Sequence, residues 1–169
     1  MKIFFLAIGF FVCVNVTEAA TVQVEWKESD KYTDIIAGNT RSQSNFESAL
    51  FKAIEGEFET QAAKLVDSYK MEVVIFDIDL AGTVALGQPI KIRKIDDSSF
   101  PRLNFYMFLY DKNNKIIFQG AQRLKERKAK HNAFRMHGSQ SEFYFEKDLI
   151  EKWFNLALVP ALKAQIAIN

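Results

Sequence analysis

The chain has 169 residues and a formal net charge of +1, and its single cysteine, Cys13, lies within the first twenty residues. Those residues have the parts of a cleavable secretory signal: a positive start at Lys2, an apolar run over 3–14 and a small-residue exit at 17–19. The apolar run is too short to span a bilayer as a helix. We therefore expect a signal peptide over 1–19 and a mature chain without disulfides, thiol catalysis or a cysteine-ligated metal.

The residues that follow the signal, 20–169, are enough to form one hydrophobic core, so we expect a single domain. Export in a bacterium predicts a periplasmic protein with no transmembrane segment after signal cleavage. Export also argues against nucleic acid as a partner.

The first predicted element is a strand over 21–27, in which apolar and polar residues alternate. Ser44 and Glu47 have the spacing of a capping box, with Ser44 accepting the backbone N–H of Glu47, and they predict the start of an amphipathic helix of about 20 residues. A second strand follows over 71–81 and ends at Gly82. A short alternating piece over 90–93 predicts a small edge strand.

The clearest element is a hairpin that joins strands over 102–111 and 115–125 through an Asp-Lys-Asn-Asn-Lys turn. Residues 126–142 have no period and predict an exposed loop. A final helix begins at about Phe145, and Pro160 should kink it or split it. The order β-α-β-β-β-α predicts an α+β two-layer sandwich: a mixed, mostly antiparallel sheet of 4–5 strands with two helices on one face.

Two carboxylates lie one residue apart in the apolar stretch "FDIDLAG", at Asp77 and Asp79. Side chains alternate across a strand, so both aspartates should lie on the side of the sheet away from the helices. The same alternation predicts a core face of Val74, Phe76, Ile78 and Leu80, and it places Val73 and Ile75 with the aspartates.

The hairpin supplies further residues to this open side. Its inward residues are predicted to be Leu103, Phe105, Met107 and Leu109. The alternate positions place Asn104, Tyr106, Phe108 and Tyr110 on the open side, with Ile117, Gln119, Ala121 and Arg123 from the return strand. An aromatic stripe of this kind either binds a ligand or partner, or is covered by a loop or a second copy of the chain.

The paired aspartates have three interpretations: a solvated or ion-paired surface, a metal site, and an acid–base dyad. A metal site wants three or more oxygen ligands, and no third acid lies in reach along the sequence. His131 and His137 have no ligand spacing, and no catalytic or nucleotide-binding motif appears. We expect no metal and no cofactor; whether the chain is an enzyme stays open, and a non-enzymatic role is favoured.

Charge is unevenly spread along the chain. Residues 28–79 contain eleven acids and five bases, whereas 88–137 contain twelve bases and four acids. Such asymmetry marks a binding face or an attraction between the two halves of the fold. The run 123–135 has six bases against one acid, which predicts either a solvated loop or a surface for an anionic lipid or polysaccharide.

Several segments together resemble a family of small exported bacterial proteins known as a domain of unknown function. The segments are "VEWKESDKYTDI" (24–35), "FDIDLAG" (76–82), "PRLNFYMFLYDKNNKIIFQGAQRLKE" (101–126) and "FEKDLIEKWF" (145–154). The resemblance implies a one-domain periplasmic protein and assigns no activity, cofactor or catalytic residue.

The sequence thus favours a periplasmic, non-enzymatic domain that binds a partner or ligand through the open side of the sheet. The partner would be an envelope protein or an anionic envelope component, and the oligomeric state is left open. The alternative is a hydrolase of envelope glycan with Asp77 and Asp79 as its paired carboxylates. The candidate site residues are Asp77, Asp79, Arg102, Tyr106, Tyr110 and Arg123.

Overall fold

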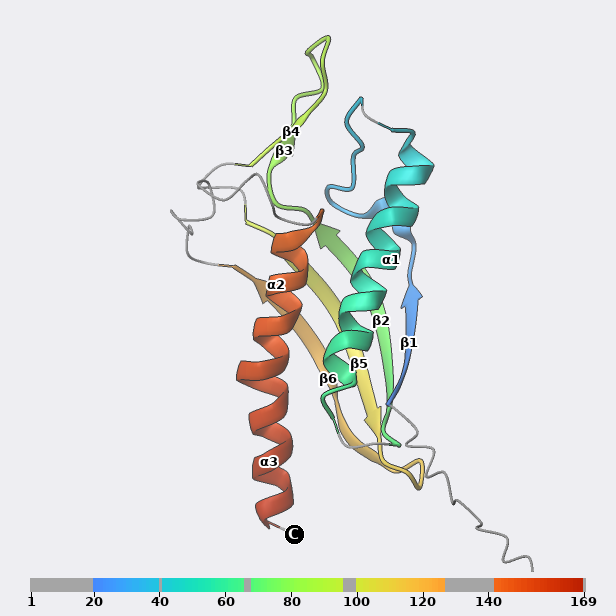
Figure 1. Cartoon of the computed structure of the whole chain (residues 1–169), viewed down its shortest axis with the longest axis vertical. Coiled ribbons are helices and arrows are strands. Elements are labelled where there is room, and N and C mark those ends of the chain that lie inside the picture. Colours follow the sequence, from blue (N-terminus) through green and yellow to red (C-terminus); the bar gives the residue numbers. More distant parts are fainter. Residues whose placement is uncertain (1–19, 40, 66–67, 96–99, 127–141, 169) are drawn as a thin grey trace, which may run out of the picture.

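The computed structural model describes residues 20–39, 41–65, 68–95, 100–126 and 142–168, with side chains described up to Gln165 (Figure 1). The predicted signal peptide, both histidines and most of the basic run 123–135 lie outside these residues.

A four-stranded mixed sheet forms one layer of the molecule, in the order β1-β2-β5-β6. Its strands are β1 (Thr21–Trp26), β2 (Lys70–Asp79), β5 (Arg102–Tyr110) and β6 (Ile116–Lys125). β1 pairs with β2 in parallel, and the other two pairings are antiparallel. Two short strands, β3 (Thr83–Val84) and β4 (Arg93–Lys94), form a separate sheet at the base of an arm that extends beyond the main sheet (Figure 1).

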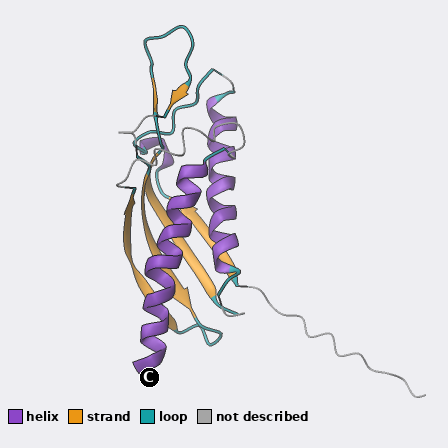
Figure 2. Ribbon diagram, turned by 60° about the vertical axis from the view of Figure 1, so that its left-hand side comes forward, coloured by secondary structure: helices purple, strands orange, loops and turns teal. Residues whose placement is uncertain are grey.

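The long helices form the second layer, and α1, α2 and α3 lie on one face of the main sheet (Figure 2). α1 (Gln43–Ala62) connects the parallel pair β1 and β2. α2 (Tyr144–Trp153) continues through a π-helical turn at Phe154–Leu158 into α3 (Val159–Ile168). The predicted α+β sandwich, with a mostly antiparallel sheet and two helical segments on one face, is confirmed.

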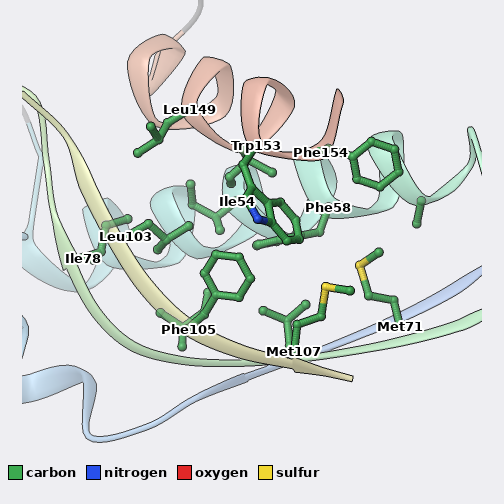
Figure 3. Close-up of a cluster of buried hydrophobic side chains, with 14 of the residues drawn as sticks. Ile54, Phe58, Met71, Ile78, Leu103, Phe105, Met107, Leu149, Trp153 and Phe154 are labelled. Carbon is green, nitrogen blue, oxygen red and sulfur yellow. The ribbon is translucent and has the colours of Figure 1, made fainter. Parts of the chain in front are cut away.

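An aromatic cluster joins the two layers (Figure 3). Phe58 of α1, Phe105 of β5 and Trp153 of α2 meet edge to face, with ring centroids 5.1–6.5 Å apart. Phe58 and Phe105 are almost fully buried, and burial of one such side chain contributes about 1.5–3 kcal/mol. The indole N–H of Trp153 donates to Gln122 Oε1 at 2.9 Å, which attaches α2 to β6. These contacts hold α1 and α2 on one face of the sheet. The strand side chains that alternate with the buried ones lie on the opposite face.

The start of α1 differs from the prediction. Ser42, rather than Ser44, is the N-cap, and its hydroxyl accepts the backbone N–H of Asn45 at 3.3 Å. The helix therefore begins at Gln43. The side-chain amide of Gln43 donates to the carbonyl of Ile35 at 2.7 Å, and this contact with the loop before the helix favours the earlier start.

Near Pro160 the last helix is divided into two α-helical segments, α2 and α3, which a π-helical turn over Phe154–Leu158 joins. Pro160 is the second residue of α3. Proline is tolerated in the first turn of an α-helix, where its missing N–H has no intrahelical partner to lose.

The predicted alternation of β2 is wrong in its first half. Met71, Val73 and Ile75 are buried, whereas Val74 is half-buried and Phe76 is 52% exposed. The pairing register with β5 shifts between Ile75 and Asp77, so Phe76 is the extra residue of a β-bulge. After the bulge Ile78 and Leu80 are buried, as predicted. The bulge therefore places Phe76 on the same side as the two aspartates.

Candidate functional site

The side of the main sheet that faces away from the helices is here called the open face. It holds the six candidate residues predicted from the sequence, since each is exposed or half-buried. The pairing register places Asp77 beside Asn104 and Asp79 beside Arg102 on this face. Arg102, Tyr106 and Tyr110 come from β5, and Arg123 comes from β6 beside Asn104. No helix of the described residues covers this face (Figure 2).

The two aspartates of the open face have different partners. Both carboxylate oxygens of Asp77 accept hydrogen bonds from Thr33, from its backbone N–H at 2.8 Å and its hydroxyl at 2.9 Å. Asp79 is paired with Arg102, whose Nε lies 3.5 Å from Oδ2. Partial burial raises the pKa of Asp79 above its usual value; the Arg102 guanidinium opposes this shift, and Asp34 and Asp77 add to it.

The aromatic residues of the open face pack against one another along β5. The ring centroids of Tyr106 and Phe108 are 4.9 Å apart, and those of Phe108 and Tyr110 are 6.3 Å apart. The hydroxyl of Tyr110 donates to Glu72 at 3.0 Å, and this bond is the main cause of a raised Tyr110 pKa. Each ring is half-buried, because it packs against the next ring along β5. The three rings therefore form one strip along the strand.

A second group of polar residues lies where β2 ends and the arm begins. Arg93 of β4 makes two bonds to the Asp34 carboxylate, at 2.8 and 3.0 Å. It also donates to the carbonyls of Gly82 and Ile36. Both charged side chains are only 17% exposed, and the remaining donor of the guanidinium, Nε, is buried and has no hydrogen-bond partner among the described residues. Arg93 thus connects the arm to the sheet and to the loop before α1.

Next to Arg93 is a cavity of about 310 Å³. It lies between the arm, the end of β2 and the beginnings of α1 and α2. The walls are mostly apolar, and Arg93, Lys91, Glu142 and Glu146 supply their charged groups. Glu142 is ion-paired with Arg41. The apolar wall residues are Ile36, Phe46, Leu80, Ala81, Ile92, Ile95, Phe143 and Phe145.

Glu146 is the most deeply buried of these charged groups, with 5% of its surface exposed. It lies in the first turn of α2, and its Oε1 accepts the backbone N–H of Ala81 at 2.7 Å. Burial raises the pKa of this carboxyl; hydrogen bonds from backbone N–H groups and the charge of Arg93 act against the shift. A buried carboxyl whose pKa is raised, in the wall of a cavity, is a candidate ligand-binding group.

Sequence reasoning did not find Asp34, Arg93 or Glu146. Arg93 was placed on a solvated edge strand, and Glu146 had no distinguishing spacing. The available signal for Glu146 was its place beside a strongly aromatic stretch, Phe143-Tyr144-Phe145, which Glu142 flanks on the other side. The pairing of Asp34 with Arg93 joins residues 59 positions apart, which no local pattern reveals.

Among the described residues, no group of three or more histidine, cysteine, aspartate or glutamate side chains is arranged to hold a metal ion. None of the described helices is both long and apolar enough to cross a membrane.

The fold and the two surfaces define a small α+β domain with one sheet face that α1, α2 and α3 leave uncovered and a mostly apolar cavity at the end of the sheet. The chain belongs to the family described as "Protein of unknown function (DUF3016)", whose model matches residues 20–156. This match confirms the resemblance to a domain of unknown function. Searches of curated proteins and of solved structures gave no match.

Proposed function

We propose that this chain is a non-enzymatic periplasmic domain that binds a small amphipathic amine in the cavity next to Arg93. The apolar part of the ligand would contact the aromatic and aliphatic wall, and its ammonium group would pair with Glu146. The observation that carries this proposal is the burial of the Glu146 carboxyl in the cavity wall.

A buried carboxylate is unfavourable unless a cation or several hydrogen bonds compensate it. Glu146 receives the Ala81 N–H, but the neighbouring guanidinium of Arg93 is already paired with Asp34. A ligand ammonium would supply a positive charge to a carboxyl that is 5% exposed. The cavity volume of about 310 Å³ lies at the lower end of the usual range for small-molecule sites.

The hydrolase alternative has less support. A raised pKa at Asp79 agrees with it. However, Asp77 is occupied by Thr33, Asp79 is paired with Arg102, and neither residue lines the cavity. The proposed periplasmic location rests on the signal peptide that the sequence predicts over 1–19.

The test compares hexylamine, hexanol and hexanoate as ligands of the mature chain, by calorimetry and thermal shift. Hexylamine should bind best, because only it brings a cation to Glu146. Glu146→Gln keeps an acceptor for Ala81 and should weaken hexylamine roughly tenfold or more while leaving hexanol unchanged, since hydrogen bonds to charged groups contribute about 1.5–3 kcal/mol.

Glu59→Gln is the matched control, since it removes the same charge from an exposed position of α1. It should bind hexylamine like the unchanged chain. Equal affinity for hexylamine and hexanol, or an unchanged hexylamine affinity in Glu146→Gln, would refute the proposed role of Glu146.

A further inference from the structure

The open face is divided into an acidic half and a basic half. β1 and β2 contain four acids, Glu25, Glu72, Asp77 and Asp79, and one base, Lys70. β5 and β6 contain no acid and three bases, Arg102, Arg123 and Lys125. The strand order β1-β2-β5-β6 places the two acidic strands side by side, next to the two basic strands.

The middle of the open face is apolar. Val74 of β2 is in register with Tyr106 of β5, which is in register with Ala121 of β6. Phe108 lies against the Tyr106 ring, and the bulge adds Phe76, which is 52% exposed. An exposed phenylalanine on an apolar strip, with charged residues around it, has the composition of a protein-binding surface.

We propose that the open face binds the open face of a second copy of the chain. The two-fold axis would be parallel to the strands and would pass between β2 and β5. Rotation about this axis exchanges the acidic and basic halves, so each acidic half lies over the basic half of the other copy. A surface that is complementary to itself under a two-fold rotation is the requirement for an isologous dimer.

The pairing register agrees with this arrangement. Asp79 is opposite Arg102, and Asp77 is opposite Asn104, which is itself next to Arg123. The axis therefore brings Asp79 of each copy to Arg102 of the other. Within one copy this pair is at 3.5 Å, and Arg102 has half of its side chain exposed, so the guanidinium has further donors for a second carboxylate.

The size of the face is sufficient for a modest dimer. β2, β5 and β6 are about 30 Å long and the six-residue β1 is about 20 Å long, so four strands about 4.8 Å apart cover roughly 530 Å² in each copy. The total of roughly 1,050 Å² is just above the lower limit of about 1,000 Å² for a biological interface. Two sheets that pack face to face lie about 10 Å apart, so Phe76 and the rings of β5 would interdigitate. Charged pairs at the border should make the dimer weaker at high salt.

The test uses two charge-reversal variants of the mature chain and sedimentation velocity. The acidic-half variant is Glu25→Lys with Asp77→Lys, and the basic-half variant is Arg123→Glu with Lys125→Glu. The unchanged chain should be a dimer at micromolar concentration. Each variant alone should be at least roughly tenfold weaker in self-association, because like charges then face each other.

A mixture of the two variants should form a heterodimer, since both contacts between the unlike copies are again between opposite charges. A control variant with Glu47→Lys and Glu59→Lys changes the same charge on α1, on the other side of the molecule, and should dimerise normally. Circular dichroism melting of each variant verifies that it folds; if the acidic-half variant does not, Glu25→Lys alone replaces it. A monomeric unchanged chain, or a mixture that stays monomeric, would overturn the proposal.

Discussion

The buried carboxyl of Glu146 combines two roles at the scale of single residues. It accepts the N–H of Ala81 and so joins α2 to the end of β2, and it is the most deeply buried of the charged groups in the cavity wall. Burial makes its charged form unfavourable, which is the physical cause of its raised pKa. The same property that would attract a ligand amine thus reduces the stability of the empty domain at neutral pH.

This reduction predicts a pH-dependent effect of Glu146→Gln on the empty domain. Because the folded-state pKa is above 4.5, the folded state binds the proton more tightly than the unfolded state. The stability that protonation provides is present below the unfolded pKa and is lost as pH rises through the folded pKa. Glutamine has no such loss, so the melting temperature of the variant minus that of the unchanged chain should increase from pH 4.5 towards neutral pH. A difference that is the same at all pH values would show that burial does not perturb Glu146.

Arg93 is predicted to be important for stability, because it holds the arm, the sheet and the loop before α1 together. Arg93→Met would leave the Asp34 carboxylate, which is 17% exposed, without its cation. Loss of one partner from such a pair costs about 3–5 kcal/mol. Urea unfolding should report this loss, and Asp34→Asn in the same chain should recover part of it. Additive losses in the double variant would mean that the two side chains do not interact.

The sequence predicted some of these residues and missed others for a physical reason. Asp77 and Asp79 were found because two carboxylates in an apolar strand are visible locally, and their position on the open face follows from alternation. Their partners were left open by the sequence: Arg102 pairs with Asp79, and Thr33, which bonds Asp77, comes from a loop 44 positions away. Arg93 and Glu146 obtain their character from burial, which depends on the tertiary structure.

At the scale of elements, the sequence predicted the long strands and helices, but it missed the N-cap of α1 and the bulge in β2. The hairpin of β5 and β6 was clear because alternation and turn chemistry agree, and Asn114 has the expected positive φ of 58°. The phase of β2 was wrong because a bulge at Phe76 exchanges the two sides in mid-strand, and nothing in "VVIFDID" distinguishes a bulge from a regular strand. This error concealed Phe76 as a residue of the open face.

The arm depends on a glycine at its base. Gly82 has φ +84°, and a Cβ there would lie 2.4 Å from the carbonyl oxygen of Lys94. Gly82→Ala should therefore destabilise the domain by about 1–3 kcal/mol in chemical unfolding. Gly87→Ala, at the outer part of the arm, is the matched control, since its Cβ meets nothing within 4 Å. Equal stability of the two variants would contradict the proposed strain at Gly82.

At the scale of the whole molecule, the order of elements was enough to predict the sandwich, because a strand–helix–strand unit and a hairpin leave few arrangements. The cavity was not predictable, since its walls come from the loop before α1, the arm and the beginning of α2. The division of charge along the chain was visible in the sequence. The fold turns it into two halves of one sheet face, and on this division the proposed dimer rests.

The cavity and the open face involve different residues, so ligand binding and self-association can be measured separately. The cavity residues Ala81 and Phe143 are outside the four strands of the open face. Hexylamine should therefore bind equally well to the unchanged chain and to the basic-half variant. A dependence of the affinity on dimerisation would show that the two surfaces are coupled.

The most direct test of the central claim is a titration of the ¹⁵N-labelled mature chain with hexylamine, followed by backbone amide shifts. The proposed site predicts that the largest shifts cluster at Ala81, Ile92, Phe143 and Glu146, and that they disappear in Glu146→Gln. Shifts that are scattered over the surface, or that cluster on the open face around Phe76 and Tyr106, would contradict it.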